Sequence, residues 1–152
     1  MHAAFDFWGD QFVPLGDKKL AENRSYFSEL ALVLIDEISM LDSDKLYMIN
    51  RREQDIFQSD LPFANIAKGL IGDTQQLPPV KGRYVYKEPY DAAYKPLFEV
   101  GNLWESFDVI DLKTNHRQGE GGQWTAVLNK IRDGIQDEEV KTVLQSRLLS
   151  DE

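Results

Sequence analysis

The chain has 152 residues, of which 42% are hydrophobic and none is cysteine, and it carries a formal net charge of −9. This length predicts one domain with its own core, and the lack of cysteine excludes disulfides and thiolate zinc sites and fits an intracellular protein. The acidic balance argues against a free-standing basic DNA-binding module, although a local groove can still contact DNA, and no apolar run reaches the ~18 residues that span a bilayer.

The first elements lead to a buried strand. The aromatic-rich start, Met1 to Leu15, is unlike a free terminus, so we expect the chain to be a fragment. Residues 17–30 predict a helix capped by Asp17, with Leu20, Phe27 and Leu30 on one face. The run from Ala31 to Ile35 then predicts a parallel strand that is covered on both faces.

A second helix and a second strand follow. The helix is expected from Asp42 or Ser43, either of which can cap it, to about Phe57. Leu46, Ile49, Ile56 and Phe57 are expected to face inward. The stretch from Ala67 to Ile71 is a second strand, which makes the unit a right-handed parallel crossover.

The second half of the chain alternates in the same way. Residues 74–96 are rich in proline and predict a long functional loop. We expect four elements after this loop: a helical turn from residue 103, a third strand from residue 108, a helix from residue 124 that stops near Gly134, and a last helix capped by Asp137. This alternation predicts an α/β layered fold.

Two carboxylates follow the first strand directly. Asp36 and Glu37 come at its carboxyl end, where open α/β sheets bind ligands. One acid can hold Mg²⁺ through water while its neighbour orients a water for attack on phosphate. A solvated strand exit is the alternative explanation of an Asp-Glu pair, and the pair taken alone favours it over a metal site.

Two later stretches also follow strands. In "IGDTQQLPPV", Pro78-Pro79 stiffens the exit and holds an amide, Gln75 or Gln76, near the end of the second strand. In "LKTNHRQ", Arg117 follows the third strand and offers a planar fork to phosphate oxygens. A proline-rich surface loop and a surface arginine are the alternatives.

Taken in order, "DEISM", "GDTQQLPPV" and "TNHRQ" resemble motifs II, III and IV of the Pif-type DNA helicases, in the RecD-related branch of superfamily 1, closest to Helitron-like versions. The resemblance extends from His2 to about Gly134. It implies a partial RecA-like P-loop NTPase domain, in which a parallel sheet is flanked by helices.

The resemblance also implies roles for individual residues. Asp36 would bind Mg²⁺ through water, and Glu37 would activate the attacking water. Gln76, placed by Gly72 and Asp73, would sense the γ-phosphate of ATP. Arg117 would contact that phosphate across the cleft between two motor domains, and His2 would belong to a segment near single-stranded DNA.

The chain contains no Gly-Lys dipeptide, whereas a P-loop requires G-x-x-x-x-G-K-[ST]. In the family this loop would precede Met1, and the second motor domain would follow Glu152. We therefore assign residues 1–152 to a partial motor domain, from a motif Ib-like segment through motif IV. We expect this chain alone neither to hydrolyse ATP at a useful rate nor to unwind DNA.

The function implied by the resemblance is that of an ATP-dependent 5′-to-3′ DNA helicase acting in telomere maintenance, repair, recombination or transposition. Its cofactors would be Mg²⁺ and ATP, and its partners single-stranded and duplex DNA, with no membrane. The nucleus is the expected location, with the mitochondrion as the alternative. Two other hypotheses remain: a non-catalytic remnant or interaction module, and a different P-loop ATPase that shares only motif II.

Overall fold

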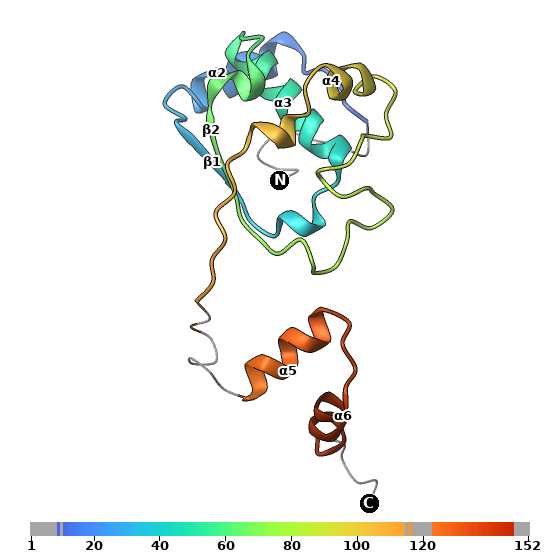
Figure 1. The fold of residues 1–152 in the computed structure, drawn as a ribbon. Coiled ribbons are helices and arrows are strands. Elements are labelled where there is room, and N and C mark those ends of the chain that lie inside the picture. The colour runs from blue at the N-terminus through green and yellow to red at the C-terminus, as the bar shows by residue number, and fades with distance from the viewer. Residues whose placement is uncertain (1–8, 10, 115, 117–122, 148–152) are drawn as a thin grey trace, which may run out of the picture. The chain divides into compact units, whose positions relative to one another are not determined.

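The computed structural model describes residues 9, 11–114, 116 and 123–147 (Figure 1). The chain divides into two compact units, Met1–Asp108 and Val109–Glu152. The assignment of both units to one motor domain stays a prediction. None of the helices in the described ranges is long and apolar enough to cross a membrane.

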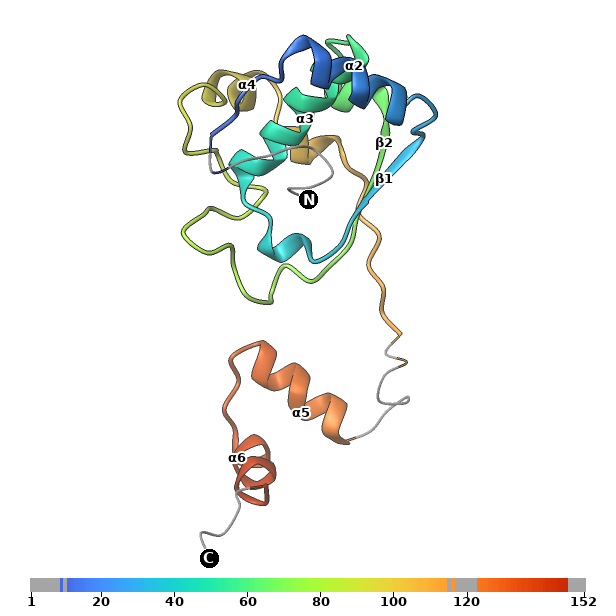
Figure 2. The same cartoon turned by 180° about the vertical axis from the view of Figure 1, so that it is seen from behind.

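The first unit contains the two predicted strands, and they pair in parallel. β1 (Leu32–Ile35) and β2 (Ala67–Leu70) lie side by side in both views (Figures 1 and 2), in a register that joins Leu32 to Ala67. Helix α3 (Ser43–Phe57) lies between them in sequence. The predicted α/β class, with a parallel sheet flanked by helices, is therefore confirmed.

The expected burial of β1 on both faces is wrong. Ile35 is buried, but Leu32 is 50% exposed and Leu34 is 64% exposed. A parallel strand is buried on both faces only where helices cover both faces of the sheet. The elements in the described part of the chain cover one face of this two-stranded sheet, so the alternate side chains of β1 remain accessible.

Helix α2 (Asp17–Tyr26) is shorter than predicted and is not capped by Asp17. Gly16 is the N-cap residue and Asp17 lies in the first turn, where an acid still favours the helix dipole. The side chain of Arg24 donates to the carbonyl oxygens of Asp55 and Ile56, at 3.0 and 2.8 Å. These carbonyls belong to the last turn of α3, so Arg24 joins the two helices and satisfies groups that a helix end leaves unpaired.

Helix α3 begins and ends where the sequence predicts. The Asp42 side chain accepts a hydrogen bond from the Lys45 amide at 2.8 Å and so caps the helix. Three of the four residues expected to face inward are almost fully buried and Phe57 is half-buried. The buried core around this helix includes Ile35, Ile38, Leu41, Leu46, Tyr47, Met48, Ile49, Phe63, Val85, Tyr94 and Leu103.

A buried ion pair connects α3 to β2. The Lys68 ammonium lies 3.0 Å from the Glu53 carboxylate, and their side chains are 3% and 0% exposed. Burial raises the pKa of Glu53 to about 7, although the positive charge of Lys68 acts in the opposite direction. Burial also lowers the pKa of Lys68, against the effect of Glu53. The loss of hydration therefore exceeds the mutual attraction for both groups.

The predicted irregular segment after β2 is confirmed, and it leads into α4 (Lys95–Val100), which the sequence analysis did not predict. Short 3₁₀ turns occupy Ile38–Met40, Pro62–Asn65 and Leu103–Ser106. The last of these confirms the helical turn expected near residue 103.

The third predicted strand, residues 108–112, is absent. Val109, Ile110 and Leu112 are 83%, 83% and 85% exposed, and their backbone makes no ladder within the described part of the chain. A strand requires a neighbour for its backbone hydrogen bonds. None of the described residues provides that neighbour, so this apolar segment is extended but unpaired.

The second unit contains α5 (Gln123–Arg132) and α6 (Glu138–Gln145), and both predicted helices are confirmed. Gly134 has a φ of 75°, the left-handed conformation that commonly ends a helix. The Asp137 side chain accepts from the Val140 amide at 3.0 Å, as predicted. Val127 and Val140 are the buried apolar residues of this unit among those described.

Candidate active site

The two carboxylates predicted at the end of β1 lie there and are exposed to solvent. The Asp36 side chain accepts a hydrogen bond from the Glu37 amide at 2.9 Å. Glu37 has φ and ψ of 54° and 50°, a left-handed conformation that costs a non-glycine residue about 1–2 kcal/mol. The chain therefore turns sharply at Glu37, and strain of this kind is common where a site requires a fixed geometry.

The end of β2 holds this turn in place. The Ile71 amide donates to the Ile35 carbonyl at 2.8 Å, and the Ile38 amide donates to the Ile71 carbonyl at 2.9 Å. These two bonds lie on either side of Asp36 and Glu37. They connect the end of the first strand with the beginning of the "GDTQQLPPV" stretch.

Gly72 lies directly against the peptide that follows Glu37. A Cβ atom on Gly72 would be 2.7 Å from the Ile38 amide nitrogen and 3.0 Å from Ile38 Cγ2. Its φ of 149° also disfavours any residue with a side chain. Glycine is thus required for the close approach of the two predicted motifs.

Asp73 shapes the turn that carries the two glutamines. Its side chain accepts from the Gln75 amide at 3.0 Å, and its carbonyl accepts from the Gln76 amide at 3.0 Å. This Asx turn supports the predicted loop geometry. The Gln76 side chain is exposed and makes no hydrogen bond to any residue that the structure describes.

The structure brings the turn at Asp36 and Glu37 against Gly72, which precedes Asp73, and the catalytic and metal-binding roles of all the predicted site residues stay predictions. Arg117 and His2 lie outside the described residues. The contact of Arg117 with a phosphate therefore stays a prediction, as does the place of His2 near DNA.

A magnesium ion fits this turn only together with another ligand. Within the described ranges, no group of three or more His, Cys, Asp or Glu side chains could hold a metal ion. Mg²⁺ commonly takes one or two carboxylates, several waters and substrate phosphates. The exposed carboxylates of Asp36 and Glu37 fit that donor set, but they do not form a cage that holds the ion by themselves.

The anchoring of the loop after Pro79 was not predicted from the sequence. Asp42 forms an isolated antiparallel bridge with Tyr84, and the Ser43 amide donates to the Arg83 carbonyl at 3.1 Å. A Cβ atom on Gly82 would be 2.5 Å from Asp42 Cβ. The glycine in "VKGRY" was a usable signal of this close approach.

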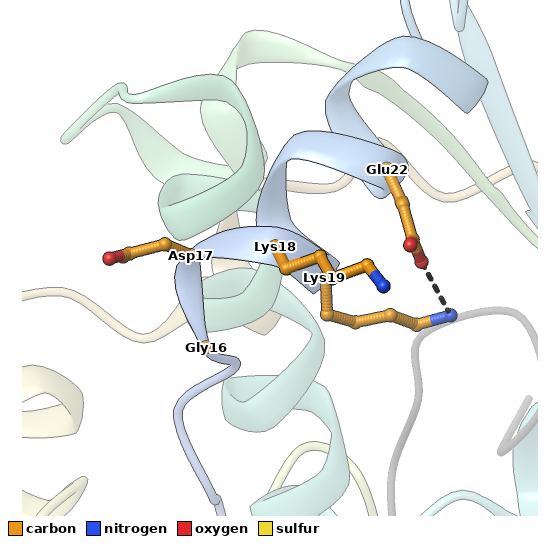
Figure 3. A pocket seen from close by; sticks show the side chains of 5 residues that line it. All are labelled: Gly16, Asp17, Lys18, Lys19 and Glu22. Atoms are coloured by element: carbon orange, nitrogen blue, oxygen red, sulfur yellow. Dashed lines mark ion pairs between the residues drawn. The ribbon is translucent and has the colours of Figure 1, made fainter.

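The surface hollow shown in Figure 3 lies away from these residues. It is lined by Gly16, Asp17, Lys18, Lys19 and Glu22 at the start of α2, where Lys19 and Glu22 form an ion pair at 3.8 Å. None of the predicted site residues lines it, so it supports no role in the chemistry expected of the turn.

Comparisons with known proteins extend over most of the chain. The PIF1-like helicase family matches residues 15–142. ATP-dependent DNA helicase Pif1 of Psychrobacter sp. (strain PRwf-1) is 35% identical over 126 residues, which cover 79% of this chain and 18% of that protein. ATP-dependent DNA helicase PIF1 of Candida albicans is 32% identical over 127 residues, which cover 77% of this chain and 14% of that protein.

Solved structures give the same likeness. The crystal structure of Pif1 helicase from Candida albicans matches 89% of this chain and 30% of its own, at 27% identity and a TM-score of 0.66. A structure of two coordinating Pif1 helicases at forked double-stranded DNA matches 93% and 35%, at 25% identity and a TM-score of 0.69. Bacteroides Pif1 bound to single-stranded DNA shares the fold, with a TM-score of 0.70 at 24% identity over 99% of this chain and 37% of that one.

Proposed function

The chain belongs to the PIF1-like helicase family, and from this membership we propose that it is part of the first motor domain of an ATP-dependent DNA helicase. The chain spans less than a quarter of the two curated helicases that it matches. The proposal therefore concerns a longer protein that moves 5′ to 3′ on single-stranded DNA and unwinds duplex DNA.

One observation carries the proposal. The hydrogen bonds of Ile71 to Ile35 and of Ile38 to Ile71 hold the acidic turn against the start of the glutamine loop. In an ATP-driven motor, the residues that hold the metal and the residues that sense the phosphate must change together. A rigid connection between their two loops supports that coupling.

We assign the chemistry to four residues. Asp36 would hold Mg²⁺ through its waters, and Glu37 would orient or deprotonate the water that attacks the γ-phosphate. Gln76 would donate a hydrogen bond to that phosphate from its exposed position. Arg117 would contact the γ-phosphate across the cleft between the two motor domains. Bound Mg²⁺ would neutralise negative charge on the phosphates.

The cellular setting follows from the family. We propose that the longer protein acts on DNA inside the cell, in telomere maintenance, repair or recombination. The nucleus is the favoured compartment and the mitochondrion is the alternative. A transposon-encoded helicase would have the same chemistry.

The first test is to sequence the transcript on both sides of the codons for this chain. We expect an in-frame G-x-x-x-x-G-K-[ST] loop upstream, because the family's phosphate binding depends on it. A stop codon or an unrelated exon there would overturn the enzyme assignment and would favour the non-catalytic interaction module, while the fold would stand.

The second test measures ATP hydrolysis by the longer protein. Glu37→Gln should lower kcat by about 10²–10⁴-fold, because general-base catalysis contributes that much. Its affinity for single-stranded DNA should stay within about twofold. Glu29→Gln, at another exposed carboxylate, is the matched control and should hydrolyse ATP like the wild type. Wild-type rates in the Glu37→Gln protein would contradict the assigned role.

A further inference from the structure

The segment from Lys81 to Lys95, called here the tyrosine loop, differs in charge from the rest of the chain. It contains four cationic side chains and two acidic ones, in a chain whose net charge is −9. It also contains four of the six tyrosines. Interleaved aromatic and cationic residues are typical of surfaces that bind single-stranded nucleic acid.

Hydrogen bonds hold the tyrosine loop against the start of α3, the helix that follows Asp36 and Glu37. The Ser43 amide donates to the Arg83 carbonyl at 3.1 Å, and the Asp91 amide donates to the Asp44 side chain at 3.2 Å. Ser43 and Asp44 are adjacent in the first turn of α3, whereas Arg83 and Asp91 lie eight residues apart in the tyrosine loop, so the loop is attached to the helix at two points. The loop therefore has a defined path, visible in Figure 1 as the irregular segment that leads into α4.

Three of the four tyrosines of the loop pack against other aromatic rings. Tyr84 and Tyr86 stack on each other with ring centroids 5.3 Å apart, and Tyr86 packs against Trp104 at 6.1 Å. Tyr94 is 6% exposed and stacks on Tyr47. Packing of the first unit explains these rings, so they carry no inference about a ligand.

Tyr90 is different, because its ring is at the surface. It is 56% exposed, and the Arg83 guanidinium lies 4.0 Å from the ring centroid. Arg83 is itself held by the Glu88 carbonyl at 3.0 Å and by the Glu88 carboxylate at 3.7 Å. The cation and the ring are thus fixed relative to each other before any partner binds, which lowers the entropy lost on binding.

Two further cations belong to the same loop as this pair. Lys81 and Lys87 are exposed, and neither has a carboxylate partner among the residues that the structure describes. Lys87 lies 5.2 Å from the ring centroid of Tyr86. Their charges can neutralise phosphates along a strand whose base stacks on Tyr90.

We propose that the tyrosine loop binds single-stranded DNA, with one base stacked on Tyr90 and its backbone phosphates on Lys81 and Lys87. The proposal rests on the helicase function proposed above and adds to it a contact outside the three motifs. It also places that contact on a loop that is anchored to α3, and α3 begins a few residues after Asp36 and Glu37 in the sequence.

The test is the binding of a fluorescently labelled single-stranded DNA oligonucleotide to the 152-residue chain at low salt. Tyr90→Ala should weaken binding about tenfold, since loss of one base–aromatic stack has roughly that effect. Tyr90→Phe should bind like the wild type, because stacking needs the ring and not the hydroxyl. A duplex of the same sequence should bind more weakly, because its bases are already stacked on each other.

The lysines have a separate signature. Lys87→Ala should reduce the slope of log affinity against log salt by about 0.7, the value for one phosphate contact with a single strand. Tyr26→Ala and Lys18→Ala are matched controls, since both are exposed side chains on α2. Neither should change the affinity or the slope appreciably.

Three results would overturn the proposal: no binding by the wild-type chain, equal affinity of Tyr90→Ala and the wild type, or equal weakening by Tyr26→Ala. Irradiation of the complex with a 5-iodouracil-substituted strand gives an independent readout. Crosslinks found only outside residues 81–95 would contradict the proposal. Failure of the proposed helicase function would be detected by different experiments, namely the transcript sequence and ATP hydrolysis by the longer protein.

Discussion

At the scale of single residues, the candidate site depends on two unusual backbone positions that contact each other. Glu37 adopts a left-handed conformation without being glycine, and Gly72 lies against the peptide that follows it. The first costs free energy, which the surrounding hydrogen bonds must offset. The second is possible only because Gly72 has no side chain.

We expect Gly72→Ala to destabilise the fold by about 1–3 kcal/mol, the usual cost of forcing a methyl group into occupied space. The new Cβ would be 2.7 Å from a backbone nitrogen, which cannot rotate away. Urea unfolding followed by tryptophan fluorescence measures the change.

Gly101→Ala is the matched control for this substitution. Gly101 has an extended φ of −175°, and a Cβ there would meet nothing within 4 Å. Its effect should stay within about 0.5 kcal/mol. Equal stability of the two variants would show that the turn and the glutamine loop are not in contact.

At the scale of elements, the sheet and α3 are joined by the buried pair of Glu53 and Lys68. Folding raises the pKa of Glu53 from 4.5 to about 7, so between these values the folded chain keeps a proton that the unfolded chain releases. The stabilisation from this group is complete below the lower value and is lost as the pH rises through the upper one. We therefore expect Glu53 to make the chain more stable at about pH 5.5 than at about pH 8.

Lys68→Met should lower the free energy of unfolding by roughly 3–5 kcal/mol at about pH 8, because it leaves a buried carboxylate without its cation. The loss should be smaller at about pH 5.5, where that carboxyl group is protonated. The double variant Glu53→Leu/Lys68→Met should regain most of the stability and should lose the dependence on pH due to Glu53. Urea unfolding at both pH values provides the measurement.

The exposed pair of Lys141 and Glu138 offers the control. Their charged atoms are 2.7 Å apart, but the two side chains are 54% and 87% exposed. Lys141→Met should change the stability by less than about 1 kcal/mol at either pH. If Lys68→Met were equally mild at about pH 8, the pair would not be buried as described.

At the scale of the whole molecule, the chain consists of two compact units separated near Asp108. Residues 109–114 are exposed, and their backbone makes no hydrogen bond to other described residues. Proteases cut where an exposed backbone can enter the active site in an extended form.

We expect limited trypsin digestion to cut first after Lys113 and to leave a product that contains the first unit intact. Mass spectrometry of the time course identifies the cut. Lys113→Gln should remove it without changing cleavage elsewhere. Protection of Lys113 would show that residues 108–112 pair as a strand after all, as the sequence analysis predicted.

The sequence was sufficient for features that depend on neighbouring residues. The limits of α3, the narrowing of its cap to Asp42 or Ser43, both helices of the second unit and the Asp137 cap follow from periodicity and from side chains that bond within three residues. The two strands and the order of the three motifs were likewise local patterns. Together they were enough to predict the α/β class and the family, because motif order does not depend on packing.

Only the tertiary structure decided the features that join distant residues. The contact of Gly72 with Ile38, the anchoring of the tyrosine loop at α3 and the pairing of Glu53 with Lys68 each connect separate elements. The missing third strand and the exposed face of β1 belong here as well, because apolar patterns say what a segment can bury but not which neighbour covers it. A strand becomes a strand only when another part of the protein accepts its hydrogen bonds, and that depends on the whole fold.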